Sequence, residues 1–325
     1  MPAISHPNWT ALPRIPEPAL PGIDRPVVTL TTAPSLLEGA GFPVRRPFPG
    51  REIGFRQADP FLLLDHMGAV EYAPGEPKGA PWHPHRGFET VTYIIDGAMQ
   101  HRDSQGGGGL ISNGSTQWMT AGAGILHDEM PPEELVKTGG LFHGFQLWVN
   151  LPSDLKRTPP RYQSLEASQV TLATSARADA LLRVIAGDLG GIKGPGITWI
   201  PVTVIHASLE PGAQVRLPWP SQWNALAYVL SGSGTVGPSH VLIHEGQGVE
   251  LGTGDVLSIG ASPNPDGSSR TLEILLLGGQ PIREPIATYG PFVMNTHDEI
   301  VQAFEDYQAG RMGTVPAQTL ERRDR

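Results

Sequence analysis

The alternation of hydrophobic and polar positions between residues 83 and 130 predicts a run of short β-strands. A β-branched and aromatic segment ends at Asp96–Gly97, a turn pair, and the chain can then return as a partner strand. The glycine-rich residues 105–109 are predicted to form a loop. The predicted strands are residues 90–95, 98–103, 110–111 and 117–120. Short strands with regular turn signals are typical of an antiparallel barrel or jelly roll.

An internal repeat predicts a second barrel of the same kind. Residues 93–97 (YIIDG) correspond to residues 228–232 (YVLSG). Two copies of one pattern in a single chain indicate two copies of one structural unit. The expected fold class is therefore all-β, with two tandem jelly-roll-type barrels.

The remaining pattern divides the chain into four parts. Residues 1–30 are rich in proline and are predicted to be a tail that is solvated or draped over the surface. We expect the N-terminal barrel at residues 31–160, where 151–160 is a linker candidate, and the C-terminal barrel at residues 161–313. Residues 314–325 are predicted to be a frayed tail.

One helix is predicted near the C-terminus. Thr296 and Glu299 form a capping-box pattern, and Gly310 is a plausible stop. Apolar residues recur between them at helical spacing: Ile300, Ala303, Phe304 and Tyr307. This helix is expected to dock one apolar face on a barrel.

Composition narrows the function classes. The 325 residues are enough for two domains with their own cores. The 23 basic and 32 acidic residues give a net charge of −9, which disfavours direct binding to nucleic acid. With no cysteine, disulfides and thiolate ligands are excluded. No apolar stretch approaches the ~20 residues of a membrane span and no signal peptide is visible, so we expect a cytoplasmic protein.

The candidate chemistry lies at the two ends of the first predicted strand set. His83 and His85 are two residues apart, as are His127 and Glu129. In a strand, residues i and i+2 point to the same face, so each pair can look into one space. Three imidazoles and a carboxylate suit a divalent transition metal; iron is favoured, and manganese, copper, nickel and zinc are rivals.

The second copy is predicted to lack this metal site. The repeat places His83 and His85 on Pro218 and Pro220, and a slightly longer shift places His127 and Glu129 on Gly267 and Ser269. Proline and glycine cannot bind a metal through their side chains, so three of the four ligand positions are lost in the second copy.

Several long segments resemble the pirin family, whose members are bicupins of the cupin superfamily. Residues 83–93 are similar to the first cupin motif of pirins, and residues 117–130 to the second. The resemblance includes residues 44–48, 65–68 and 290–296, and it spans roughly residues 37–313. It implies a metal held in the N-terminal barrel by His83, His85, His127 and Glu129.

The resemblance implies two alternative functions. The first is quercetin 2,3-dioxygenase activity on a flavonol-like substrate, in which Glu129 is the catalytic residue and accepts the proton of the 3-hydroxyl group. The second is a regulatory protein that binds a transcription factor or metabolic enzyme according to its iron state. A metal-dependent isomerase is a third interpretation. We expect a monomer.

The other ionisable residues receive a structural interpretation. Glu89 is a ligand in many cupins, but here Glu129 supplies the carboxylate, so Glu89 is expected to be a buried partner. His101 and Asp103 could steady a ligand by a hydrogen bond or stand at a loop end. The histidines without a partner at ligand spacing are taken as structural: His66, His143, His206, His240, His244 and His297.

Overall fold

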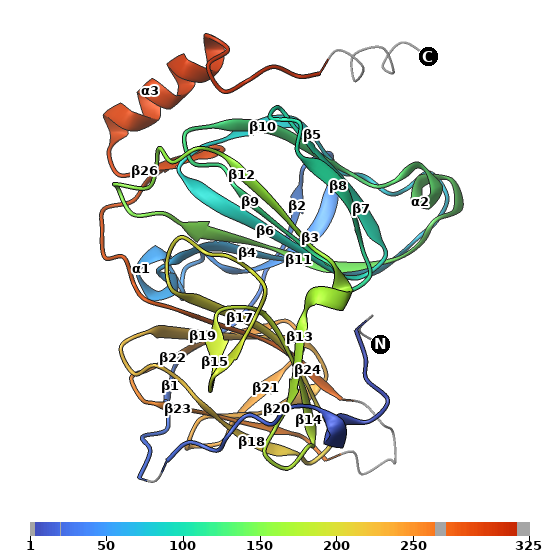
Figure 1. The fold of residues 1–325 in the computed structure, drawn as a ribbon, viewed down its shortest axis with the longest axis vertical. Coiled ribbons are helices and arrows are strands. Elements are labelled where there is room, and N and C mark those ends of the chain that lie inside the picture. Colours follow the sequence, from blue (N-terminus) through green and yellow to red (C-terminus); the bar gives the residue numbers. More distant parts are fainter. Residues whose placement is uncertain (1–3, 20, 264–270, 317–325) are drawn as a thin grey trace.

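Two β-barrels are stacked along the long axis of the molecule, as Figure 1 shows. The computed structural model describes residues 4–19, 21–263 and 271–316. The expected all-β class is confirmed, since strands dominate and the helices are short. Within the described residues, no helix is long and apolar enough to cross a membrane.

The N-terminal barrel consists of a seven-stranded and a four-stranded antiparallel sheet. The first has the order β12-β9-β6-β11-β4-β3-β2 and the second β5-β10-β7-β8. The strands are β2 (Ser35–Glu38), β3 (Phe42–Phe48), β4 (Phe61–Tyr72), β5 (Ala80–His85), β6 (Phe88–Asp96), β7 (Ala98–Asp103), β8 (Gly108–Ser112), β9 (Thr116–Thr120), β10 (Ile125–Met130), β11 (Gly140–Asn150) and β12 (Arg161–Leu165). Short helices α1 (Phe55–Ala58) and α2 (Glu133–Thr138) interrupt them.

The C-terminal barrel repeats this topology. Its sheets have the orders β1-β22-β19-β24-β17-β14-β13 and β18-β23-β20-β21. The strands are β1 (Val27–Thr32), β13 (Thr171–Thr174), β14 (Ala180–Ala186), β17 (Val202–Leu209), β18 (Gln214–Pro218), β19 (Asn224–Ser231), β20 (Ser233–Val236), β21 (Val241–His244), β22 (Gln247–Leu251), β23 (Val256–Ala261) and β24 (Leu272–Gly279). Smaller elements are η1 (Trp9–Ala11), η2 (Ala167–Gln169), β15 (Asp188–Leu189) and β16 (Ile192–Lys193).

The two barrels exchange strands at their boundaries, which differs from the expected limits at residues 30 and 160. β1 pairs with β22 and so extends the C-terminal barrel. β12 pairs with β9 and so completes the N-terminal barrel. A hydrophobic pattern predicts that a segment is a strand, but it does not predict which strand it pairs with. The pattern therefore does not predict that β1 and β12 belong to these barrels.

The proline-rich N-terminal segment lies along the C-terminal barrel. The backbone N–H of Ile15 donates to the carbonyl of Thr174 at 2.8 Å, and the Ile15 side chain is buried in the core of that barrel. Arg25 is also buried and donates to the carbonyls of Gly252, Pro220 and Trp223. The segment is thus draped on the surface, as one of the two interpretations expected.

The seven-stranded sheets of the two barrels face each other and share one core. This core contains residues of both halves, such as Phe145 and Leu64 from the first and Val204 and Leu275 from the second. Polar pairs also cross the contact: His66 Nδ1 lies 3.0 Å from the Tyr228 hydroxyl. The large shared core makes the two barrels one packed unit.

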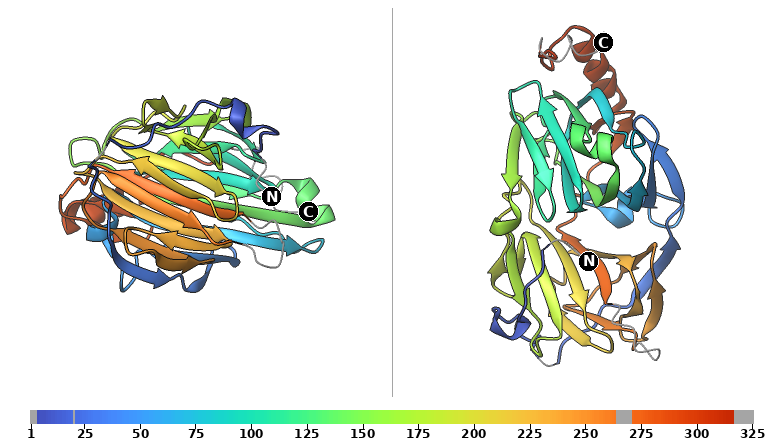
Figure 2. Two further views of the ribbon diagram at one scale, coloured as in Figure 1. Left: turned by 90° about the horizontal axis from the view of Figure 1, so that it is seen from below. Right: turned by 90° about the vertical axis from the view of Figure 1, so that its right-hand side faces the viewer.

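The C-terminal hairpin and helix return to the N-terminal barrel. The hairpin is β25 (Ala287–Tyr289) and β26 (Phe292–Met294), and α3 spans His297–Gln308. The capping box is present, with Thr296 as N-cap and Glu299 at the third position. The helix packs on Leu126 through Ile300 and Ala303. It lies at the far end of the N-terminal barrel (Figure 2), whereas the predicted boundaries grouped it with the C-terminal barrel.

Candidate metal centre

Two neighbouring strands of the four-stranded sheet bring three histidines together. His83 and His85 end β5, and in the register of the β5–β10 pair His127 lies opposite His83. His85 and His127 are buried, and His83 is partly exposed. One ligand atom of each of the three lies within 4.8 Å of the others.

The hydrogen bonds of two of these histidines define their tautomers. His83 Nδ1 lies 2.7 Å from the carbonyl oxygen of Pro81, and His85 Nδ1 lies 3.2 Å from that of Pro291. A carbonyl oxygen only accepts, so each Nδ1 carries the proton and each Nε2 presents a lone pair. The two Nε2 atoms are 3.0 Å apart. Two facing lone pairs repel each other unless a cation lies between them.

The spacing of the nitrogens fits a transition metal. His127 Nε2 is 2.9 Å from His83 Nε2, close to the 3.0 Å that separates His83 from His85. For metal–nitrogen bonds of about 2.1 Å, two ligands at a right angle lie about 3.0 Å apart. The imidazoles present therefore fit a single divalent ion with adjacent coordination positions.

Burial keeps two of the imidazoles neutral. It lowers the pKa of His85 well below its usual value, and the nearby His83 lowers it further. Burial likewise lowers the pKa of His127, with added effects of His83 and His85. A neutral imidazole is the form that binds a metal.

Glu129 lies on β10 beside this cluster, and three polar side chains hold its carboxylate. Thr92 Oγ1 donates to Oε1 at 2.9 Å, and Gln117 Nε2 donates to the same oxygen at 2.8 Å. Gln146 Nε2 donates to Oε2 at 2.7 Å. A ligand atom of Glu129 lies within 4.8 Å of those of His127 and His101, a second group that shares His127 with the three histidines but does not include His83 or His85. The four-residue ligand set thus stays a prediction.

His101 and Asp103 are buried inside the barrel, and Asp103, the last residue of β7, also accepts hydrogen bonds from the backbone N–H groups of Gln105 and Gly107 in the following loop. His101 Nδ1 is 3.3 Å from His127 Nδ1, and His101 Nε2 is 3.4 Å from Asp103 Oδ2. Both side chains are buried. Burial alone would raise the pKa of Asp103, but hydrogen bonds from His101 and from two backbone N–H groups lower it overall. The pair is placed to fix the orientation of the His127 ring.

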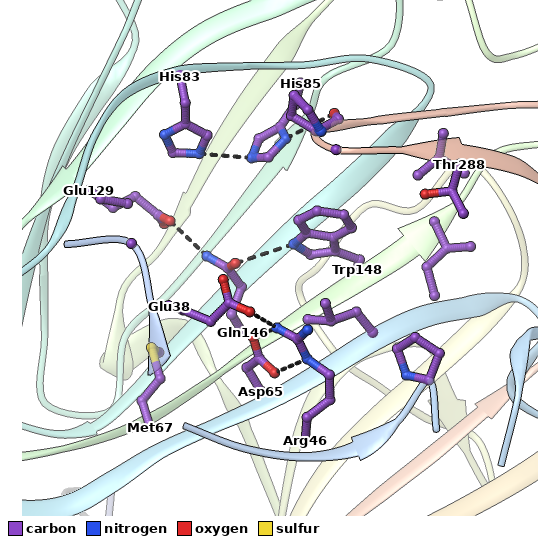
Figure 3. Close-up of a pocket in the computed structure, with 18 of the residues that line it drawn as sticks. Glu38, Arg46, Asp65, Met67, His83, His85, Glu129, Gln146, Trp148 and Thr288 are labelled. Atoms are coloured by element: carbon purple, nitrogen blue, oxygen red, sulfur yellow. Dashed lines mark hydrogen bonds and ion pairs between the residues drawn. The ribbon is translucent and has the colours of Figure 1, made fainter. Parts of the chain in front are cut away.

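A pocket of about 560 Å³ opens beside the histidines. Its walls include Phe42, Phe55, Leu62 and Trp148. Figure 3 shows His83 and His85 along one side of it, Glu129 and Gln146 in the middle, and Asp65 and Arg46 on the opposite side. Its volume lies within the range of small-molecule sites.

Part of this pocket comes from residues that sequence reasoning did not select. Thr288, Gly290, Pro291 and Val293 belong to the C-terminal hairpin, more than 150 positions away along the chain. Residues 290–296 are among the segments that resemble pirins, and this resemblance is the sequence signal that links the hairpin to the site. Gln146 showed no such signal, because its position depends on the register of β11.

Glu89 lies away from the metal cluster. It alternates with Thr90 on β6, so its side chain points to the opposite face of the sheet from Thr92. It accepts a hydrogen bond from Thr120 Oγ1 at 2.7 Å, and Arg161 lies 3.9 Å away. Burial raises the pKa of Glu89 to about 7. The expected role as a buried partner fits this environment.

The remaining histidines fall into two classes. His66, His143 and His206 lie at the contact between the barrels, where His66 Nε2 is 2.8 Å from His143 Nε2 and His206 Nε2 is 3.0 Å from Glu273 Oε2. His240, His244 and His297 are exposed. None of these six belongs to a group of potential ligands in the part of the chain that the structure describes.

The C-terminal barrel has an apolar interior at the corresponding place. β18 and β23 occupy the positions that β5 and β10 have in the first barrel. Val215 and Leu217 of β18 and Leu257 and Ile259 of β23 belong to its hydrophobic core. The repeat predicts Gly267 and Ser269 as the counterparts of His127 and Glu129, and both lie outside the described residues. In the topology, the counterpart of β10 is instead β23. Within the described residues, both groups of potential metal ligands belong to the N-terminal barrel.

Comparison with known proteins identifies the family. Residues 41–149 match the family model Pirin, and residues 204–313 match the Pirin C-terminal cupin domain. The chain belongs to the pirin family. It is 39% identical over 285 residues to pirin of Homo sapiens, a match that covers 87% of this chain and 92% of the relative.

Other pirin-family relatives cover nearly the whole chain. A pirin-like protein of Solanum lycopersicum is 41% identical over 297 residues, which is 89% of this chain and 93% of the relative. A crystal structure of quercetin 2,3-dioxygenase from Acinetobacter baumannii is 38% identical and superposes with a TM-score of 0.82, covering 90% of this chain and 99% of that chain. The bicupin architecture is therefore shared along the full length of the matched proteins.

Proposed function

We propose that this pirin-family protein is a mononuclear metal dioxygenase that cleaves a flavonol-like substrate in the manner of a quercetin 2,3-dioxygenase. The proposed metal is iron(II), and manganese, copper, nickel and zinc are the competing choices for the same donors. One observation carries the proposal: the facing Nε2 atoms of His83 and His85, 3.0 Å apart, line a largely apolar pocket.

The proposed ligands are His83, His85, His127 and Glu129. Three neutral imidazoles and one carboxylate would leave a divalent ion with a net charge of about +1 and one or two open positions. When bound, the metal supplies a Lewis acid at which the substrate oxygen and dioxygen can meet. The similarity to the Acinetobacter baumannii quercetin 2,3-dioxygenase supports this choice of reaction.

The residues of the chain would bind and deprotonate the substrate. Phe42, Phe55, Leu62 and Trp148 offer apolar contacts to a planar ring system and exclude water from it. Glu129 would accept the proton of the substrate hydroxyl, and Gln146 orients its Oε2 oxygen by a hydrogen bond of 2.7 Å. In the net reaction, one dioxygen is consumed and one carbon monoxide is released as the heterocycle opens.

Turnover under defined conditions tests the proposal. The protein is loaded with iron(II) without oxygen, mixed with quercetin and exposed to dioxygen, and carbon monoxide is measured in the headspace. We expect about one carbon monoxide per substrate consumed, and a loss of at least 100-fold in the His127→Ala variant, in line with the loss of an essential group. His244→Gln, at an exposed position, is the control.

The opposite outcome would favour the regulatory alternative. If the protein, loaded with each of the five candidate metals in turn, releases no carbon monoxide, the dioxygenase proposal is wrong. Tight binding to a protein partner that changes with the metal state would then support the regulator.

A further inference from the structure

The side of the pocket away from the histidines carries a charged cluster that the proposed chemistry leaves unused. Arg46 on β3 donates to both oxygens of Asp65, from Nε at 2.7 Å and from Nη2 at 2.6 Å. The same Nη2 lies 2.5 Å from Oε1 of Glu38 on β2. All three residues line the pocket (Figure 3).

A polar row connects this cluster with Glu129 across the inner face of the large sheet. Gln117, Thr92, Gln146 and Asp65 are successive partners in the register of β9, β6, β11 and β4. Gln117, Thr92 and Gln146 all donate to Glu129, so Asp65 lies one strand beyond them. Glu38 reaches the pocket from the far edge of this sheet, in the order β11-β4-β3-β2. At this edge the backbone N–H of Ala40 donates to the carbonyl of Gly79 at 2.9 Å, directly before β5.

The charge of the cluster selects for hydrogen-bond donors. One guanidinium and two carboxylates leave a net charge of −1, and Glu129 adds another negative charge to the same pocket. An anionic group would be repelled here, whereas a hydroxyl group can donate to a carboxylate oxygen. Among the described residues, Oε2 of Glu38 has no hydrogen-bond partner, and the side chain is 38% exposed. It is therefore free to accept from a ligand.

The surrounding walls require an aromatic body between the two polar ends. Phe42 and Met67 line the pocket near the cluster, and Phe55, Leu62 and Trp148 line it elsewhere. The pocket of about 560 Å³ has room for more than a single ring. A neutral molecule of two or three rings, with hydroxyl groups at both ends, matches the volume of the pocket, its apolar walls and its charge.

From these observations we infer that Glu38, held by Arg46 and Asp65, is a specificity-determining residue that accepts a hydrogen bond from a hydroxyl group on the distal ring of the substrate. The inference rests on the proposed function, because it assumes that the other end of the same ligand binds at the metal. If Glu38 has this role, the substrates are neutral aromatic compounds with several hydroxyl groups, and aromatic carboxylates of the same size do not bind.

Binding without oxygen tests this inference separately from catalysis. Iron(II)-loaded protein is titrated anaerobically with quercetin and with galangin (3,5,7-trihydroxyflavone), which share the 3-hydroxyl, 4-carbonyl and 5-hydroxyl groups and differ only in the two hydroxyl groups of the remote ring. Quenching of tryptophan fluorescence reports the two dissociation constants. We expect wild-type protein to bind quercetin about tenfold more tightly, the size of one hydrogen bond to a charged group.

Variants of Glu38 identify the residue responsible. The tenfold ratio should fall to about one in Glu38→Ala and to an intermediate value in Glu38→Gln, which keeps an acceptor without the charge. Glu245→Gln is the matched control: Glu245 pairs with Arg45 at 2.9 Å on the outside of the molecule, and the ratio should stay near tenfold. Glu38 is on an edge strand and partly exposed, so both variants should fold.

Two further outcomes separate the inference from the proposed function. If the ratio in Glu38→Ala equals that of wild type while carbon monoxide is still produced, the cluster only ties β2 to β3 and β4, and the inference is wrong. If the ratio falls as expected but no carbon monoxide forms, the dioxygenase proposal fails and the inference stands. Wild-type protein that binds neither compound would overturn both.

Discussion

At the scale of single residues, the proposed metal centre depends on which nitrogen of each imidazole carries the proton. The carbonyl oxygens of Pro81 and Pro291 accept hydrogen bonds from the Nδ1–H groups of His83 and His85. The Nε2 lone pairs are thereby directed at one another, and burial opposes protonation of His85. Such an arrangement is unfavourable without a cation and favourable with one.

Gln146 should contribute to this centre although it is not a proposed ligand. In a Gln146→Leu variant, Oε2 of Glu129 loses its donor at 2.7 Å, so the carboxylate is no longer held in one orientation. We expect the affinity for the metal or the rate of turnover to fall by roughly 10- to 100-fold, the usual effect of such hydrogen-bond partners. Competition with a chelator measures the affinity.

A substitution on a neighbouring strand provides the control. Gln100 is exposed on β7, so Gln100→Leu should keep the wild-type affinity. Equal affinities of Gln146→Leu and wild type would show that the carboxylate orientation does not depend on this hydrogen bond.

The structure brings together His83, His85 and His127, which the spacing of the sequence had paired, but the sequence did not predict their surroundings. Two pairs at a spacing of two residues, in segments that looked like strands, predicted a shared face for His83 and His85. Thr92, Gln117 and Gln146 meet at Glu129 from three different strands. Their meeting depends on strand order and register, which single residues do not encode.

At the scale of elements, buried histidines join the two large sheets. Burial lowers the pKa of His66 to about 3, with a smaller effect of His143. Burial lowers the pKa of His143 to about 4, with a smaller effect of His206. In the unfolded chain both would titrate near 6.5. Between the folded-state pKa values and 6.5, the unfolded state binds more protons than the folded state. The free energy of unfolding therefore has its full value above pH 6.5 and decreases as the pH falls below it.

Acid should therefore weaken the contact between the barrels. At pH 5.5 we expect a loss of roughly 1 kcal/mol for each of the two histidines relative to pH 7.5, from the difference in proton uptake. Urea unfolding at both pH values measures the loss. His143→Gln should show a smaller loss than wild type, and the exposed His244→Gln should match wild type. A pH dependence that is unchanged in His143→Gln would exclude His143 as its source.

The elements themselves were predicted unequally. α3 was expected from its capping box and apolar spacing, and it begins after Thr296 as predicted. β7 spans the predicted residues 98–103. The pairing of β1 with β22 was not predicted, because strand alternation is the same whichever sheet the strand joins.

At the scale of the whole molecule, each half of the chain completes the other. β1 from the N-terminal segment extends the C-terminal barrel, and the C-terminal hairpin and α3 close the N-terminal barrel. Arg86 follows His85 directly and donates to Asp306 of α3 at 2.6 Å. Lys156, also buried, donates to the carbonyls of Gly87 and Val293. The candidate metal centre is thus assembled from both halves of the chain.

Loss of the contact between Arg86 and α3 should destabilise the protein. Asp306→Asn leaves the Arg86 guanidinium buried without its full counter-charge, and breaking such pairs costs about 3–5 kcal/mol. Thermal unfolding at neutral pH measures the change. Asp298→Asn, in the first turn of the same helix, is the control and should have a much smaller effect. Equal stability of Asp306→Asn and wild type would show that α3 is held by its apolar face alone.

The two barrels share one topology but differ in their interiors. The first directs histidines inward from β5 and β10, and the second fills the same place with Val215, Leu217, Leu257 and Ile259. The protein should therefore hold one metal ion and not two. The fold itself does not depend on His83, since that side chain is only partly buried.

Elemental analysis of protein purified without chelators or a metal-affinity step tests this claim most directly. We predict about one transition-metal ion per chain in the wild type, with iron the most abundant metal, and less than about a tenth of that in His83→Ala with an unchanged circular dichroism spectrum. Full metal content in His83→Ala, or two ions per wild-type chain, would contradict the account.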